Sequence, residues 1–381
     1  MKDFLSRLPL PITVLALAWV VLGNSLQGVI PFLSDLCMVI TILLLLLTLM
    51  KLIFMPKTSF KSLSTPVGLS MFSTFALSLI MIAVWMKGVF DKANIYFWVT
   101  GVILEAIILV IFIVKYVLNF KLKSVFSTWY LVFVGIGMAS ITGSDFGMEV
   151  FGRAILKYIF VAAIVLTPFI VYRYMRVSLT SAAKPLIGIF AFPLGVIIPS
   201  YIALGQNIST RNLWIMWICL QVIFIAIMVY LAFHLFDGYY PSNSAYGLAA
   251  AITLYATREF ELYLIARKLS TGFIQYLMYF EFVLAFVICA VISVSYLMNT
   301  LEDPEKHRQK VKENKEKERK RLREKRRAHQ KRLREIEISK DKKETRKNKV
   351  STRKTDQVSN TEKEPKKSLL VDIEDAESLI D

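Results

Sequence analysis

The chain has 381 residues, 55% of them hydrophobic, with 46 basic and 29 acidic side chains. The charges crowd beyond about residue 300 and apolar runs fill the rest, which excludes an ordinary soluble domain. The composition predicts an all-α polytopic membrane protein with a charged appendage. Cys37, Cys219 and Cys289 all lie in apolar runs and are expected to be buried thiols. No histidine has a second ligand at metal-binding spacing, so neither a metal nor another cofactor is expected.

The N-terminus carries Lys2 and Arg7 before an apolar run, as a signal peptide does. Pro9 and Pro11 at the start of that run, and no small-residue cleavage motif after it, favour a first membrane span instead. Ten apolar windows that can cross about 30 Å of hydrocarbon are expected. They cover residues 9–23, 33–55, 66–86, 93–119, 128–143, 152–172, 185–204, 211–236, 242–257 and 273–298.

The odd-numbered windows recur at a nearly constant interval. They begin near Pro9, Pro66, Thr128, Pro185 and Pro241, at intervals of 57, 62, 57 and 56 residues. A fixed repeat length indicates a symmetric architecture. The repeat predicts five helical hairpins.

The two halves of each predicted hairpin differ in composition. Odd windows hold most of the glycines and many serines, threonines and alanines, whereas even windows are rich in leucine, isoleucine, valine and phenylalanine. Close helix packing or a lumen favours the first composition and lipid favours the second, so five inner and five outer helices are expected. The stretch 180–201 contains Pro185, Gly188, Pro193, Gly195 and Pro199, which predicts a broken helix in a transport pathway; an ordinary kinked span is the alternative.

Basic residues at the ends of the windows suggest the orientation. With the N-terminus inside, inner segments hold eleven of them and outer segments eight. An even number of spans and a polybasic tail place both termini in the cytoplasm. We expect two parts: a transmembrane domain over 1–300 and a charged cytoplasmic tail, helical or disordered, over 301–381. The tail contains 27 basic and 19 acidic residues. It is expected to stay solvated, to contact anionic lipid or to bind a ribosome; no specific nucleic acid is expected.

No odd window contains a charged residue between its ends, whereas cation pathways and proton-driven carriers usually place an ionisable group there. A neutral lumen with basic residues at its mouth suits anions, because they are attracted without being trapped. The expected anion-attracting inner rim consists of Arg7, Lys61, Lys121, Lys123, Arg173, Arg176 and Lys184. Two acids, Glu105 and Glu281, lie inside even windows; we expect them to be neutral or hydrogen-bonded at helix contacts, and a proton-linked role is the alternative.

Five segments that open the odd windows resemble a known family. They are LPLPITVLALAWVVLGN (8–24), STPVGLSMFSTFALSLI (64–80), STWYLVFVGIGMASITG (127–143), KPLIGIFAFPLGVIIPSY (184–201) and YYPSNSAYGLAAAI (239–252). Their order and spacing are similar to those of the tellurite-resistance and dicarboxylate transporters, in the superfamily of voltage-dependent and slow anion channels. That family includes the yeast malate permease and the plant guard-cell slow anion channels.

The resemblance implies five hairpins in a ring around a central pore, and a homotrimer with one pore per protomer. It also implies a pore-plugging phenylalanine in the ninth span, followed by proline; here Leu248 and Ala249 stand in those positions. The family's early glycine and its proline opening the fifth span fall at Val14 and Ser127, as in a divergent bacterial member. The expected pore and gate residues are Leu248, Phe72, Phe75, Phe190, Phe192, Gly137, Pro193 and Gly247.

These observations favour an anion channel or transporter of the bacterial cytoplasmic membrane. The expected substrates are small inorganic anions or C4-dicarboxylates such as malate, or tellurite or sulfite for export. An enzyme is not expected, because the odd windows offer no charged catalytic group. The alternative is a membrane insertion factor or scaffold whose basic tail binds a ribosome or anionic lipid.

Overall fold

The computed structural model describes residues 2–87, 90, 93–177, 179–206, 208–234 and 238–301. Every regular element in that part of the chain is a helix, which confirms the all-α prediction. The expectations about the tail concern residues 302–381, which lie outside the described ranges. The boundary between the two predicted parts therefore stays a prediction.

The helices follow one another with short connections. In chain order they are α1 (Lys2–Arg7), α2 (Ile12–Leu26), α3 (Pro31–Phe54), α4 (Pro56–Leu63), α5 (Pro66–Met86), α6 (Asn94–Phe112), η1 (Ile113–Val117), η2 (Leu122–Ser124), α7 (Trp129–Phe133), α8 (Gly137–Ile141), η3 (Gly143–Phe146), α9 (Glu149–Arg176), η4 (Ser181–Ala191), α10 (Phe192–Leu204), α11 (Thr210–His234), η5 (Pro241–Asn243), α12 (Ser244–Ala266) and α13 (Gly272–Leu301).

Seven helical segments among the described residues are long and apolar enough to cross a membrane. They are Pro31–Phe54, Pro66–Met86, Asn94–Val117, Glu149–Arg176, Ser181–Leu204, Thr210–His234 and Gly272–Leu301. The other three predicted windows are helical too, but α2 is short and the segment Trp129–Ile141 is interrupted between α7 and α8. The helix of the ninth window runs on to Ala266 instead of ending at 257, so Arg258, Glu259 and Glu261 lie within it. Seven candidate membrane spans are therefore present among the described residues, and ten spans remain a prediction.

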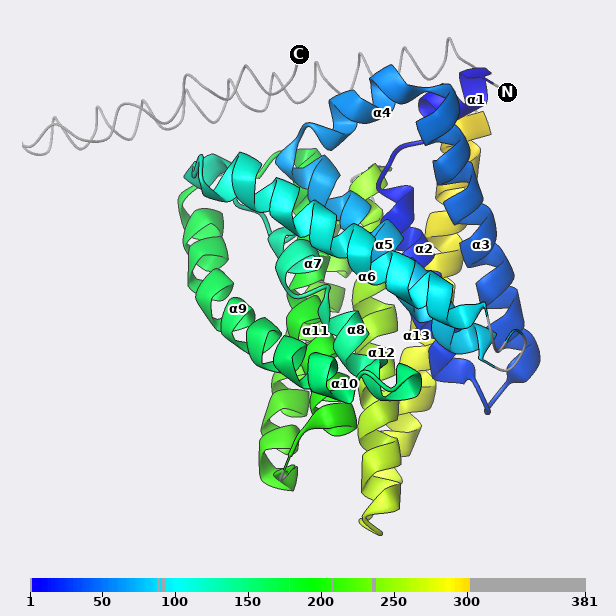
Figure 1. Ribbon diagram of the computed structural model, residues 1–381, viewed down its shortest axis with the longest axis vertical. Coiled ribbons are helices and arrows are strands. Elements are labelled where there is room, and N and C mark those ends of the chain that lie inside the picture. Colours follow the sequence, from blue (N-terminus) through cyan, green and yellow to red (C-terminus); the bar gives the residue numbers. More distant parts are fainter. Residues whose placement is uncertain are drawn as a thin grey trace, which may run out of the picture. The chain divides into compact units, whose positions relative to one another are not determined.

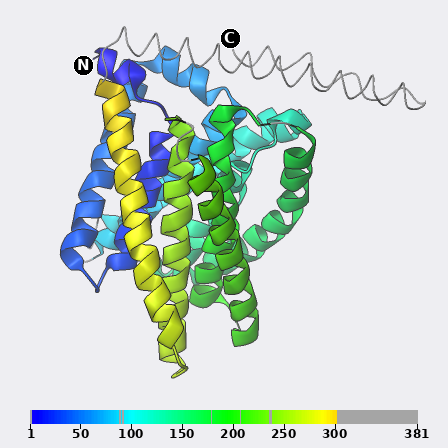
Figure 2. The same ribbon diagram turned by 180° about the vertical axis from the view of Figure 1, so that it is seen from behind.

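Contacts between helices follow the repeat seen in the sequence. Consecutive helices pack in the pairs α2 with α3, α5 with α6, α8 with α9, α10 with α11 and α12 with α13. A second set of contacts joins α2 to α5, α5 to α7 and α8, α8 to α10, α10 to α12, and α12 back to α2. We call α2, α5, α7–α8, η4–α10 and α12 the inner ring, and α3, α6, α9, α11 and α13 the outer helices. In Figure 1, α6 and α9 lie outside the ring; seen from behind in Figure 2, the yellow helix α13 runs along the outside.

Burial separates these two sets of helices. In the most apolar window of α5, 72% of the residues are buried, and 67% in that of Ser181–Leu204. The corresponding shares for the five outer helices lie between 28% and 33%. The outer helices therefore present most of their surface outward, as the leucine-rich composition of the even windows predicts.

Hydrogen bonds tie neighbouring segments of the inner ring together. Six side chains donate to backbone carbonyls between 57 and 63 residues away, which is the length of the sequence repeat. The pairs are Thr13 with Met71, Asn24 with Met81, Ser73 with Leu131, Ser127 with Leu186, Ser200 with Gly137 and Ser242 with Ala182. Such bonds satisfy backbone groups in apolar surroundings, especially where a helix is interrupted.

The predicted broken helix is present. Residues Ser181–Ala191 form the 3₁₀ segment η4, and the chain changes to α-helix at Phe192, with Pro193 in the first turn and Pro199 inside α10. Gly188 allows a close backbone approach at this break, because a Cβ there would lie 2.6 Å from the Ala245 carbonyl oxygen of α12. The break in the helix therefore requires glycine at position 188, where η4 contacts α12.

Candidate functional site: the inner ring and its basic end

Parts of the inner ring are fully buried in this structure. Between Ile12 and Leu22, no residue of α2 exposes more than 2% of its surface. This helix packs against α3, α5, α12 and α13. Leu248 on α12 and Phe192 on α10 are fully buried as well. Water therefore does not reach these parts of the ring, from outside or from within.

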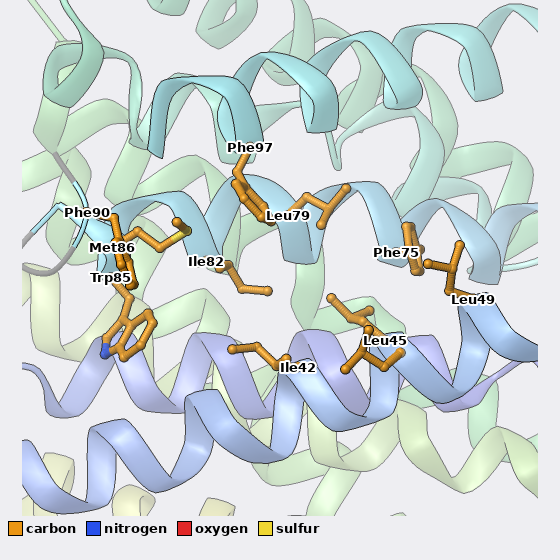
Figure 3. Close-up of a pocket in the computed structure, with 11 residues that line it drawn as sticks. Ile42, Leu45, Leu49, Phe75, Leu79, Ile82, Trp85, Met86, Phe90 and Phe97 are labelled. Carbon is orange, nitrogen blue, oxygen red and sulfur yellow. The ribbon is translucent and has the colours of Figure 1, made fainter. Parts of the chain in front are cut away.

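The aromatic residues predicted to line a pore lie in different places. Phe72 is 9% exposed and stacks on Phe75 with ring centroids 5.5 Å apart. Phe75 itself lines an apolar cavity of about 340 Å³ between α3, α5 and α6, together with Leu45, Leu79 and Phe97 (Figure 3). Phe75 thus faces an outer helix pair. Phe190 packs edge to face against Tyr130 and Tyr174.

The predicted pore glycines lie at close contacts between helices. A Cβ on Gly137 would meet Val196 of α10 at 2.5 Å and Ile159 of α9 at 2.7 Å. A Cβ on Gly247 would lie 3.3 Å from the Cys289 sulfur of α13 and 3.8 Å from Ala18 of α2. These glycines let the ring helices approach one another and the outer helices, as small residues do in membrane proteins.

The predicted basic rim lies at one end of the bundle. Four hydrogen bonds there join the start of an odd window to the end of an even one. Lys51 donates to the Leu8 carbonyl, Tyr116 to the Ser64 carbonyl and Tyr296 to the Pro241 carbonyl. In the fourth bond, the hydroxyls of Tyr174 and Ser127 are 2.9 Å apart. The predicted rim residues lie in the chain segments around these bonds, and Figure 1 shows α1 and α4 together at this end.

The rim residues differ in burial. Lys61, Lys121 and Arg176 are exposed, while Arg7, Lys123 and Lys184 are partly buried. Arg173 is only 4% exposed. Its guanidinium lies 4.2 Å from the centre of the Phe126 ring and 5.5 Å from that of Tyr174. One member of the predicted rim is therefore a core residue.

Glu105 forms a buried polar contact between the outer helix α6 and the inner ring. It is fully buried on α6, and the Ser73 hydroxyl of α5 lies 2.7 Å from both of its carboxyl oxygens. The same hydroxyl lies 3.1 Å from the Leu131 carbonyl oxygen of α7. A serine has one proton to donate, so satisfying both acceptors requires a proton on Glu105. Glu105 then acts as a neutral acid that connects α6, α5 and α7, as the sequence analysis expects of it.

Glu281 lies in a second buried polar cluster. Its side chain is 1% exposed on α13, beside Gln221 and Thr257. Gln221 and Trp217 of α11 both donate to the Thr257 hydroxyl of α12, at 3.0 and 3.1 Å. Glu281 therefore lies at a contact of three helices, but neither of its carboxyl oxygens has a hydrogen-bond partner among the described residues.

Sequence reasoning missed several polar residues that hold the ring together. Thr13, Ser73 and Ser200 contributed to the sequence analysis only through the small-residue composition, and Ser127 only as the residue in place of the family's proline. The sequence signal that could have identified them is a hydroxyl residue about one repeat length away from the backbone carbonyl that accepts its hydrogen bond. Sequence reasoning was also wrong about Cys219, which is exposed on the outside of α11, whereas Cys37 and Cys289 are buried.

The fold and the ring define the class: an all-helical protein that crosses the membrane several times. A comparison with families of known proteins matches residues 8–300 to the voltage-dependent anion channel family. The chain belongs to this family, which confirms the resemblance drawn from the five segments. It is accordingly a membrane protein of the anion channel and transporter class. A comparison with individual curated proteins finds no match.

Proposed function

We propose that the inner ring encloses the anion pathway of this channel. The observation that carries the proposal is the closed series of contacts among the five small-residue segments of the inner ring. The charged side chains of these segments are Lys184 near the start of η4 and Arg258, Glu259 and Glu261 in the last part of α12. A neutral lumen passes ions by width and by the cost of dehydration. The basic residues at one end raise the local concentration of anions.

The described conformation corresponds to a closed channel. Full burial of Leu248, and of α2 from Val14 to Ala18, supports an apolar constriction that stops ions without a charged gate. In this proposal Leu248 forms the gate, with Phe72 or Phe192 as partner from α5 or α10. The position of Phe75 toward α3 and α6 makes Phe72 the better partner on α5.

The membrane arrangement completes the proposal. All ten helical windows cross the cytoplasmic membrane of a bacterium as five hairpins, and both termini lie in the cytoplasm. The alternating hydrogen bonds at the basic end support this topology. The homotrimer and the single pore per protomer rest on the family resemblance. Proton coupling through Glu105 or Glu281 is the alternative to a passive channel.

The substrates that fit this lumen are small inorganic anions and C4-dicarboxylates. The test is ion replacement in liposomes that hold purified full-length protein, with chloride, nitrate, sulfite, malate and tellurite in turn. Reversal potentials should follow the anion gradient, and their shifts rank the substrates. Reversal potentials that follow potassium would reject an anion pathway.

The insertion factor or scaffold remains the second candidate function because of the basic tail. Co-sedimentation of full-length protein and of protein ending at Pro304 with ribosomes separates the two functions. Tail-dependent sedimentation together with absent anion flux would favour the scaffold.

A further inference from the structure

Arg173 ends an otherwise apolar stripe on α9. The buried face of this helix consists of Gly152, Ile155, Ile159, Ala163, Leu166, Ile170 and Arg173, spaced three or four residues apart. This spacing places all seven side chains on the side of α9 that packs against α7, α8 and α10. An arginine therefore occupies a position that the pattern assigns to an apolar side chain.

The guanidinium of Arg173 lacks the acceptors that a buried cation needs. Its Nε and Nη1 atoms are buried and make no hydrogen bond to any described residue. The neighbouring Tyr174 hydroxyl lies 2.9 Å from that of Ser127, which donates to the Leu186 carbonyl at 2.6 Å. Leaving a buried charge without hydrogen bonds costs several kcal/mol, so such a group calls for an explanation. A negatively charged ligand would supply the missing acceptors.

A second buried cation shows what a satisfied one looks like here. Lys51 lies near the same end of the bundle, at the end of α3, and is also 4% exposed. Its ammonium donates to the Leu8 carbonyl and so joins α3 to the start of the first window. Lys51 has a structural partner within the protein, whereas two nitrogens of Arg173 do not.

We propose that Arg173 binds a small inorganic anion of the chloride or nitrate class at the basic end of the ring. The site lies where the fifth and seventh windows begin, since Phe126 and Ser127 precede α7 and Leu186 belongs to η4. Nε and Nη1 donate to the anion while the Phe126 ring covers the face of the guanidinium. Both nitrogens are shut off from solvent, so entry requires Phe126, which is only partly buried, to move.

The tight enclosure of Arg173 decides the class of ligand. A compact anion displaces few packed atoms, whereas a dicarboxylate or a lipid phosphate would need a cavity around the guanidinium. The inference rests on the proposed function, because it identifies a binding step at the mouth of the proposed anion pathway. It is tested by a binding measurement that does not depend on transport.

The measurement is thermal unfolding of purified full-length protein at constant ionic strength, with gluconate replaced stepwise by chloride or nitrate. A ligand that binds the folded state raises the melting temperature in a saturable manner. We expect this rise in the wild type and in Lys157→Gln, which removes a positive charge from an exposed position on the same helix outside the predicted rim. Arg173→Gln should abolish it, and Arg173→Lys should shift half-saturation to about tenfold higher anion concentration, because lysine keeps the charge but lacks the planar fork of two donor nitrogens.

Three results would overturn the site. One is a wild-type anion response in Arg173→Gln, or in Arg173→Lys should the glutamine variant not fold. Another is no saturable response in the wild type. The third is stabilisation by phosphatidylglycerol in nanodiscs without any response to chloride or nitrate, which would assign Arg173 to a lipid headgroup. Anion flux in liposomes is measured in parallel. If the wild type shows the thermal response to anions, Arg173→Gln loses it, and the wild type carries no anion flux, the proposed function is rejected and the binding site is kept.

Discussion

The inner and outer helices have similar hydropathy but very different burial. Mean hydropathy is 2.1 for α5 and for Ser181–Leu204, and 2.3 to 2.7 for the five outer helices. Burial differs more than twofold in the opposite direction. In a membrane, apolar character alone does not distinguish a helix inside the bundle from one that faces lipid. Glycines at close contacts and hydroxyls that reach backbone carbonyls make that distinction here.

The largest expected effect comes from filling a close contact in the ring. Gly188→Val would press a side chain against the Ala245 backbone, where the Cβ alone comes within 2.6 Å of the carbonyl oxygen. Overpacking typically costs about 1–3 kcal/mol, and backbone contacts relax poorly. Folded yield and melting temperature in detergent should both fall. Gly272→Val at the start of α13, where no atom lies within 4 Å of the added Cβ, is the matched control. Equal behaviour of the two variants would contradict tight packing at the break.

Removing the buried acid should have the next largest effect. Glu105→Ala removes the buried hydrogen bond between Glu105 and Ser73 and leaves Ser73 only the Leu131 carbonyl, which costs about 1–3 kcal/mol. Glu105→Gln should retain most of the stability, because the amide donates to Ser73 while Ser73 donates to Leu131. Glu149→Ala is the control, since its ion pair with Arg153 is exposed and worth at most about 1 kcal/mol. Urea or thermal unfolding measures all three. A Glu105→Gln variant as unstable as Glu105→Ala would rule out a neutral acid.

If Leu248 forms the gate, two substitutions at this position should change anion flux in opposite directions. Leu248→Ala should widen the constriction and raise anion flux per folded protomer, whereas Leu248→Phe should reduce it. If Leu248 is only a core residue, alanine costs about 2–5 kcal/mol and leaves flux per folded protomer unchanged. In that case the constriction belongs to Phe72 or Phe192 instead. Normalising liposome flux to folded protein separates the two roles.

The smallest effect is expected from the tail. The buried residues of the described chain lie between Leu5 and Thr300. Ending the protein at Pro304 should therefore change melting temperature and flux little, while regulation or partition to anionic lipid can change. Aggregation of the shortened protein in detergent would show that the tail supports the fold.

The repeat made much of the fold predictable. Intervals of 56 to 62 residues between odd windows reappear as contacts between neighbouring ring segments, and prolines and glycines marked the break before Phe192. The prediction ended the ninth window at 257, before the charged residues Arg258, Glu259 and Glu261, but α12 continues to Ala266. Phe260 and Leu264 of the continued part are fully buried, and Arg258 pairs with Glu261 at 2.7 Å.

The side chains of the candidate site were harder to predict. A window of sequence shows that Arg173 follows an apolar run, but only its place on the buried stripe distinguishes it from Arg176, three residues further on. The direction of Phe75 depends on contacts with α3 and α6, which local sequence does not contain. The identity of helices was thus readable from local patterns, whereas the role of individual residues depended on tertiary contacts.

The most direct test of the central claim is chemical block of the pathway from inside the ring. Leu248→Cys is made with Cys219→Ser, which removes the exposed thiol, and anion flux is measured before and after a charged thiol reagent under conducting conditions. Val291→Cys on the outer face of α13 is the control, because this side chain is 57% exposed outside the ring. The account predicts a fall of flux in Leu248→Cys and none in Val291→Cys. Modification at Leu248→Cys that leaves flux intact, or equal block at both positions, would contradict an anion pathway through the inner ring.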